Sequence, residues 1–182
     1  MEYDKTIQLK DGRHCVLRNG TARDGFAVYA NFNLTHGQTD FLLSYPEENS
    51  MTAEQEAQFL QKKTESQREI ELVAEIGGQI VGTAGIEQVS AKEKVRHRAE
   101  FGISVDQQYW GLGIGRALAE ACVACAKKAG YAQLELNAVA DNKRALKLYE
   151  SVGFVEFGRN PRGFRSRQTG WQELVYMRLE LD

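Results

Sequence analysis

The chain has 182 residues, with 25 acidic and 23 basic side chains that give a net charge of −2 at neutral pH. This near-balance of charge argues against a nucleic-acid-binding domain, because such domains are typically strongly basic. No apolar run approaches the ~20 residues needed to cross a bilayer. The length predicts a single domain over residues 1–182 that can close its own core, and a hydrophobic content of 42% is typical of a globular protein.

The amino-terminal part predicts a strand followed by a helix. Residues 7–18 have a weak strand pattern. Thr21 and Asp24 have the spacing of a capping box, in which two side chains satisfy free backbone N–H groups, so a helix should begin there. We expect its apolar face to carry Phe26, Val28 and Phe32.

A second helix and a hairpin come next. Thr52 and Gln55 repeat the capping-box spacing ahead of a short helix over 57–63. Two strand-like runs within 70–88 flank Gly77–Gly78, a pair that suits a tight turn with positive φ. This segment therefore predicts an antiparallel hairpin.

The clearest strand and helix follow a charged segment, 90–98, which predicts a solvated loop. In residues 99–105 apolar and polar side chains alternate, as in a strand with one buried face. Apolar residues then recur at helical spacing over 114–129, and Gly130 stands where a glycine cap would end that helix.

The carboxy-terminal part continues the alternation of strands and helices. Residues 132–139 predict a strand, and Asn142 can cap a short helix that ends at Gly153. Residues 154–158 and 172–181 predict the final strands, on either side of an arginine-rich loop. The order strand, helix, strand, helix, strand, strand implies an α/β sheet with parallel pairing in its middle.

Three glycines, at positions 111, 113 and 115, surround the start of the helix at Ile114. The first N–H groups of a helix have no internal partner and lie at the positive end of its dipole, so they can bind a phosphate that glycines allow to approach. The dinucleotide fingerprint fails here because Arg116 replaces its third glycine. The Walker pattern fails because no Gly-Lys-Ser/Thr follows.

This segment resembles the GNAT superfamily of acyl-CoA-dependent N-acyltransferases. Gly113 and Gly115 match the glycines of that family's signature, and Trp110 stands where Arg or Gln is usual. A second signature is matched by NKRALKLYESVGF over 142–154, at the expected separation. LRNGTARD over 17–24 is more loosely similar to the family's opening segment.

The resemblance, which covers roughly residues 70–180, implies a particular fold and ligand. The fold is a mixed α/β one, with a mostly antiparallel twisted sheet, a central parallel pair splayed for the cofactor, and helices on both faces. The ligand is acetyl-CoA, whose pantetheine arm would pair with backbone groups of Ile103, Ser104 and Val105. The pyrophosphate would lie on Gly111, Leu112, Gly113, Ile114, Gly115 and Arg116. Asn142 would reach the pantetheine or cap its helix.

The implied reaction is direct attack of an amine on the acetyl thioester in a ternary complex. Tyr149 is similar to the hydroxyl that lies near the thioester sulfur in the family, and it can supply a proton to the leaving thiolate. A strand N–H near Val105 is the candidate donor to the carbonyl oxygen. If Tyr149 instead only fills the apolar helical stripe, it is a core tyrosine with one hydrogen bond.

Glu100 is our candidate for the general base. It lies on the polar side of the strand 99–105, where burial would favour proton uptake. In the first alternative Glu100 pairs with Arg98, His97 or a loop arginine and has no chemical role. The others are the rival bases Glu135 and Asn137, or a chain of water molecules that takes the proton.

An arginine cluster lies between the last two predicted strands, at Arg159, Arg162, Arg165 and Arg167. Guanidinium groups could receive a carboxylate or phosphate of the acceptor. They could equally contact the 3′-phosphate of the cofactor, a dimer partner, or only solvent.

We therefore expect an N-acetyltransferase that acts on a primary amine of a small molecule or peptide, with no metal, no nucleic acid and no membrane. Cys122 and Cys125 lie on the apolar helical stripe, so we interpret them as core residues. The polar amino terminus and the odd cysteine number indicate a cytoplasmic protein. Family habit suggests a homodimer through the last strands. The alternatives are a non-catalytic acyl-CoA-binding regulatory module and a Rossmann-type oxidoreductase.

Overall fold

One sheet of eight strands forms the centre of the computed structural model, which describes residues 1–181. The strands are β1 (Asp4–Gln8), β2 (His14–Asn19), β3 (Ile70–Ile76), β4 (Gln79–Gln88), β5 (Arg98–Val105), β6 (Gln133–Val139), β7 (Val155–Ser166) and β8 (Gly170–Glu180). They lie in the order β1-β2-β3-β4-β5-β6-β8-β7. Every neighbouring pair is antiparallel except β5 with β6. A doubly wound Rossmann sheet is mostly parallel, whereas this sheet has one parallel pair, so the oxidoreductase alternative is wrong.

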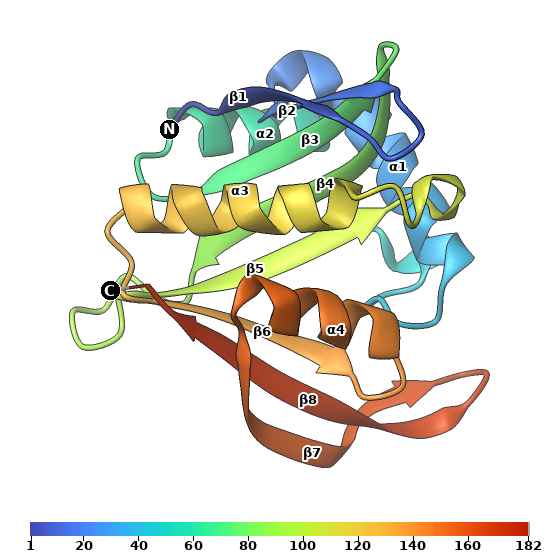
Figure 1. The fold of residues 1–182 in the computed structure, drawn as a ribbon, viewed down its shortest axis with the longest axis vertical. Coiled ribbons are helices and arrows are strands. Elements are labelled where there is room, and N and C mark those ends of the chain that lie inside the picture. Colours follow the sequence, from blue (N-terminus) through green and yellow to red (C-terminus); the bar gives the residue numbers. More distant parts are fainter. Residues whose placement is uncertain (182) are drawn as a thin grey trace.

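Helices cover both faces of this sheet (Figure 1). They are α1 (Gly25–Gln38), α2 (Ala53–Glu65), α3 (Ile114–Lys128) and α4 (Lys143–Val152), with short 3-10 helices η1 (Ala22–Asp24), η2 (Pro46–Glu48) and η3 (Gln107–Tyr109). In Figure 1, α3 and α4 cross in front of the sheet and α2 lies behind it. The expected mixed α/β architecture is confirmed. Within residues 1–181 no helix has the length and apolarity of a membrane span.

Each face has its own apolar cluster. On the α3 side, Leu118 and Cys122 are fully buried against strand residues such as Leu134, and Cys125 lies beside them. The placement of both helical cysteines in the core is therefore confirmed. On the other side, Val28 of α1 and Leu60 of α2 pack with Val73 and Ile80. These two clusters fix which face of the sheet each helix pair covers.

The predicted helix and turn signals of the first half are confirmed, with one exception. Both capping boxes form, and the second starts α2, where Thr52 accepts from the backbone of Gln55 at 3.3 Å. Gly77 and Gly78 have φ values of +57° and +83° in the turn between β3 and β4. The exception is Phe26, which is 75% exposed, so the expected apolar face of α1 is wrong at that position.

Two predicted boundaries are wrong. Residues 7–18 are not one strand, because the chain turns at Gly12, where φ is +88°, and β1 pairs back on β2. The arginine-rich segment is not a loop either. It continues β7 to Ser166, and only a short turn separates β7 from β8. The last two strands therefore form a long hairpin that projects beyond β6 (Figure 1).

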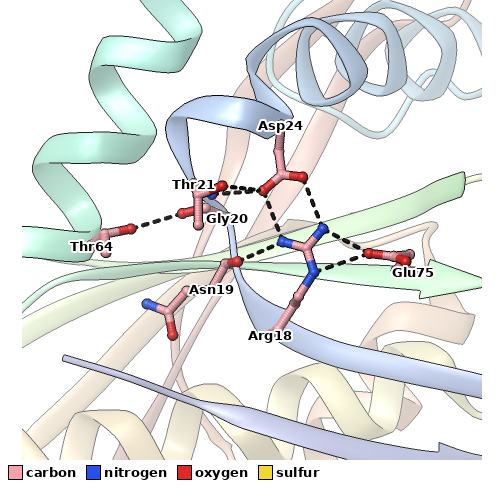
Figure 2. A network of polar contacts seen from close by, with 7 residues as sticks. All are labelled: Arg18, Asn19, Gly20, Thr21, Asp24, Thr64 and Glu75. Atoms are coloured by element: carbon pink, nitrogen blue, oxygen red, sulfur yellow. Dashed lines mark hydrogen bonds and ion pairs between the residues drawn. The ribbon is translucent and has the colours of Figure 1, made fainter. Parts of the chain in front are cut away.

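Residues of the segment 17–24 form an ion-pair network that connects β2 to the start of α1 (Figure 2). The guanidinium group of Arg18 binds both oxygens of Asp24, at 2.8 and 2.9 Å, and the carboxylate of Glu75 on β3, at 2.7 Å. Asp24 also accepts from the backbone and the hydroxyl of Thr21. Arg18 holds the pKa of Asp24 down to about 2. The network stabilises the junction and lies outside the residues that line the cleft described below.

Candidate active site

A cleft opens where β5 and β6 separate. The two strands pair over only three positions, from Arg98 with Gln133 to Glu100 with Glu135. Beyond that point β5 stays paired with β4 as far as Val105, and β6 stays paired with β8 as far as Val139. Beyond the three paired positions, the facing edges of β5 and β6 make no hydrogen bonds to each other, and a cleft of about 910 Å³ lies between them. The predicted splay of the parallel pair is confirmed.

The glycine segment lies at one end of this cleft, at the start of α3. Gly113 caps the helix with φ +103°, and Gly111 has φ +82°. The backbone N–H groups of residues 111–116 donate to no residue within 1–181. A Cβ atom built on either glycine would meet nothing within 4 Å, so the space above these N–H groups is open. Such a row of free donors at a helix N-terminus suits a phosphate group.

Gly115 has a different reason to be glycine. A Cβ atom there would lie 3.1 Å from Cδ1 of Leu148, so the missing side chain lets α3 and α4 approach each other. Ile114, the first residue of α3, has a buried side chain. Leu112 packs against the core, and its carbonyl oxygen accepts a hydrogen bond from the backbone N–H of Lys10. Of the residues 111–116, Leu112 alone does not line the cleft.

Four basic side chains line the cleft near this segment: Lys10, Arg116, Lys143 and Arg144. The guanidinium carbon of Arg144 lies 4.1 Å from the centre of the Trp110 ring, a cation–π contact that holds it at the mouth. Desolvation lowers the pKa of Arg144. Sequence reasoning found Arg116 but missed the other three, because they come from a distant turn and from the start of α4.

Trp110 also fixes the end of β5. Its indole N–H donates to the carbonyl oxygen of Val105 at 2.6 Å, so that carbonyl already has a partner. Ile103, Ser104 and Val105 all line the cleft from β5. Asn142 lines the opposite wall, and its side chain accepts from the backbone N–H of Ala145 at 3.2 Å. The predicted helix cap is confirmed, and the side-chain amide is left as a donor.

Tyr149 reaches the cleft from α4. The residue is 9% exposed, and its ring packs edge-on against Phe101 and Phe154, each with centroids about 6 Å away. Its hydroxyl makes no hydrogen bond to any of residues 1–181, so it is free to donate to a molecule bound in the cleft. Burial raises the pKa of Tyr149 to about 12, so the hydroxyl stays protonated at neutral pH.

The two candidate carboxylates differ in their surroundings. Glu135 accepts two hydrogen bonds from Arg98, one of them at 2.7 Å, and its side chain is 12% exposed. Glu100 lines the same cleft but is exposed, so the expectation that it is buried is wrong. Glu100 makes no ion pair within residues 1–181, and Arg98 is committed to Glu135 instead. Asn137 lines the cleft on β6, two residues beyond Glu135.

The predicted arginine cluster does not converge on the cleft, since none of its members lines it. Arg159 pairs with Glu156 and Glu173, and Arg167 pairs with Glu47. The other two, Arg162 and Arg165, lie over the ring of Trp171, at 5.7 and 5.0 Å from its centre. Their separation follows from the strand that replaces the expected loop.

A sheet split at its one parallel pair, with a glycine-lined helix start at the split, defines an acyl-CoA N-acyltransferase type of fold. The profile of the acetyltransferase (GNAT) family matches residues 36–154, and the chain belongs to that family. The acetyltransferase of GNAT family from Streptococcus pneumoniae superposes with a TM-score of 0.87 and 27% identity, over 91% of this chain and 99% of that one. The structure of yncA from Salmonella typhimurium, which contains its cofactor acetyl-CoA, has a TM-score of 0.80 at 20% identity, over 92% of this chain and 94% of that one.

Curated relatives are similar over part of their length. L-amino acid N-acyltransferase MnaT from Escherichia coli (strain K12) is 28% identical over 61% of this chain. N-acetyltransferase 8 from Rattus norvegicus is 37% identical over 48% of it. The chain spans less than two-thirds of the length of either relative, 64% of the first and 40% of the second.

Proposed function

We propose that the chain is an N-acetyltransferase that moves an acetyl group from acetyl-CoA to a primary amine. The observation that carries this proposal is the row of free N–H groups over 111–116, with open space above it and four basic side chains nearby. A pyrophosphate fits this donor set, because its oxygens accept hydrogen bonds and its charge is compensated. The acetyl-CoA bound by yncA supports the same ligand by analogy of fold.

The residues of the cleft divide the remaining work. Residues 103–105 lie along the unpaired edge of β5 and offer backbone groups to the pantetheine arm, as an added strand would use them. The amide donors of Asn142 face the same arm from the opposite wall. In this proposal the split sheet orients the thioester, and the N–H groups near Val105 stabilise the charge that develops on its carbonyl oxygen.

Glu100 and Tyr149 are assigned to the two proton transfers. The amine arrives as an ammonium and gives a proton to the Glu100 carboxylate, directly or through water. Its nitrogen then forms the amide bond with the acetyl carbon while the carbon–sulfur bond breaks, and the second proton that this nitrogen loses returns through water to the tyrosine that protonates the thiolate. The thiolate that leaves takes a proton from Tyr149, whose raised pKa keeps that proton available. No covalent bond to the protein forms.

Binding and turnover test the proposal separately. Coenzyme A at about 100 times its dissociation constant should add about 2.7 kcal/mol to the free energy of unfolding, which raises the melting temperature by roughly 5–10 °C. Release of free thiol from acetyl-CoA should depend on an added primary amine. No stabilisation by coenzyme A would refute the proposal. Stabilisation without turnover on any amine would favour the alternative, a regulatory module that binds acyl-CoA.

A further inference from the structure

The end of the cleft away from the glycine segment is walled by apolar side chains. They come from the segment after α1, from β7 and from β8: Phe41, Leu42, Leu43, Phe157, Phe164, Leu174 and Tyr176. Leu43 is 87% exposed and Phe157 is 50% exposed. Both therefore present apolar surface that a bound molecule could cover.

The wall residues that lie on the sheet share a face with Glu100. Successive strand residues point to opposite faces, and Phe101 packs on Tyr149 beneath α4, so Glu100 points to the other face. On β8, Met177 is buried in the cluster beneath α3 and α4, so Tyr176 also points away from it. The apolar wall and the Glu100 carboxylate therefore belong to one compartment.

The walls of this compartment are held by contacts between distant segments. The carboxylate of Asp40 accepts from the hydroxyls of Ser166 and Thr169 at the turn of the β7–β8 hairpin. The hydroxyl of Tyr45 accepts from the backbone N–H of Arg167 at 2.7 Å. The segment after α1 is thus fixed to the hairpin, so the apolar residues on both sides are positioned relative to each other.

The charges in this compartment are uneven. Arg98 and Glu135 neutralise each other in a bidentate pair, whereas Glu100 makes no ion pair within residues 1–181. The other basic residues of the cleft gather at the glycine segment: Lys10, Arg116, Lys143 and Arg144. Glu100 is therefore the carboxylate of this compartment without an ion-pair partner, and Arg98, which is close enough to interact with it electrostatically, is already bound to Glu135.

We infer that the acceptor is a monoamine whose ammonium group meets Glu100 and whose body is apolar and of aromatic size, with no carboxylate next to the amine. This inference rests on the proposed function and names its substrate class. An α-amino acid would bring its carboxylate against Glu100 without a partner. A polyamine would bring a second ammonium among the apolar walls, where the carboxylate next to Glu100, Glu135, is already paired with Arg98.

A panel of matched acceptors tests the inference with the full chain and acetyl-CoA. We expect kcat/KM for 2-phenylethylamine to exceed the values for L-phenylalanine and putrescine by ~100-fold or more, because each disfavoured acceptor buries an unpaired charge. L-Phenylalaninamide separates the effect of charge from that of size, because a neutral carboxamide replaces the carboxylate of L-phenylalanine with a group of similar size. It should be acetylated at least ~10-fold better than L-phenylalanine.

Substitutions in the wall supply the second arm. Phe164→Ala should lower kcat/KM for 2-phenylethylamine by ~10-fold or more and leave the KM for acetyl-CoA unchanged. The matched control is Phe26→Ala, at an exposed phenylalanine outside the cleft, which should change neither value. Leu43→Glu, at an exposed position of the wall, should raise kcat/KM for putrescine relative to 2-phenylethylamine.

The outcomes separate this inference from the proposed function. If coenzyme A binds and L-phenylalanine or putrescine is the best acceptor, the inference is overturned and the proposed function stands. If Phe164→Ala and Leu43→Glu both leave kcat/KM for 2-phenylethylamine unchanged, the inference is also overturned, because the wall would then not contact the acceptor. Failure of coenzyme A to bind overturns both.

Discussion

The guanidinium group of Arg98 donates to both carboxylate oxygens of Glu135, across the short parallel ladder that β5 and β6 share. This pair lies just before the strands separate, and it closes the base of the cleft. It also distinguishes the two rival carboxylates. Glu135 is held by a cation, while Glu100, its neighbour across the same ladder, has no cationic partner within residues 1–181.

A comparison of two isosteric substitutions tests the base. Glu100→Gln removes the proton acceptor and should lower kcat by ~10²-fold with the melting temperature nearly unchanged. Glu135→Gln should act mainly on stability, because it leaves Arg98 without its partner, and we expect a loss of roughly 1 kcal/mol. Steady-state kinetics and thermal melts measure both. Full activity in Glu100→Gln would instead assign the proton to a water chain.

Tyr149→Phe tests the proton donor. The substitution keeps the ring among Phe101 and Phe154 and removes only the hydroxyl. We expect kcat to fall by ~10²-fold while the affinity for coenzyme A is kept. Tyr131→Phe is the matched control, because Tyr131 is 4% exposed yet does not line the cleft. If the two substitutions lower kcat by the same factor, Tyr149 contributes only packing and does not donate the proton.

The raised pKa of Tyr149 adds a prediction about pH. A tyrosine whose pKa is about 12 in the folded protein stays protonated up to that range, so its ionisation should not limit kcat at any pH below about 11. A decline of kcat with an apparent pKa near 10, present in the parent enzyme and absent from Tyr149→Phe, would contradict this environment for the hydroxyl. The measurement is a pH profile of kcat for both proteins.

Much of the fold could be predicted because its signals are local. Gly77–Gly78, Asn142 and Gly153 each act within a few residues of their own position, and each lies in the turn or cap that the sequence indicates. The first hairpin is not predicted although Asp11-Gly12 is a turn signal, because the flanking strands have little apolar alternation to mark them.

The acceptor side of the cleft could not be predicted, because it depends on contacts between residues far apart in the chain. Asp40 and Ser166 are 126 residues apart, and neither belongs to a local pattern. For the same reason the sequence predicts one cluster of the arginines between the last strands, which the structure separates. Their directions depend on the register of β7 with β8, where the chain bulges near Gly158 and again after Asn160.

The pair of Arg18 and Asp24 predicts a pH dependence of stability. Arg18 lowers the pKa of Asp24 from its ordinary 3.8 to about 2 in the folded protein. The stabilisation is therefore present above about pH 4 and is lost as the pH falls from about 4 towards 2, an effect of about 2 kcal/mol. Asp24→Asn should lower the free energy of unfolding at pH 7 and flatten its dependence on acid.

Denaturant titrations from pH 2 to pH 7 measure this effect. Asp11→Asn is a control, because the carboxylate of Asp11 pairs with Arg13 at the surface and little stability should depend on it. A parent protein and an Asp24→Asn variant with parallel stability profiles below pH 4 would show that another carboxylate dominates the acid transition.

Gly113→Ala tests whether the start of α3 binds the cofactor. The φ of +103° makes any side chain strained there, at a cost of ~1–2 kcal/mol, and the new methyl group would stand in the open space above the free N–H groups. Gly130→Ala is the matched control, because Gly130 ends the same helix with φ +76° and equally open surroundings. Both variants should lose similar stability, whereas only Gly113→Ala should weaken coenzyme A binding, by ~10-fold or more, in a calorimetric titration. Equal affinity in the two variants would place the pyrophosphate elsewhere.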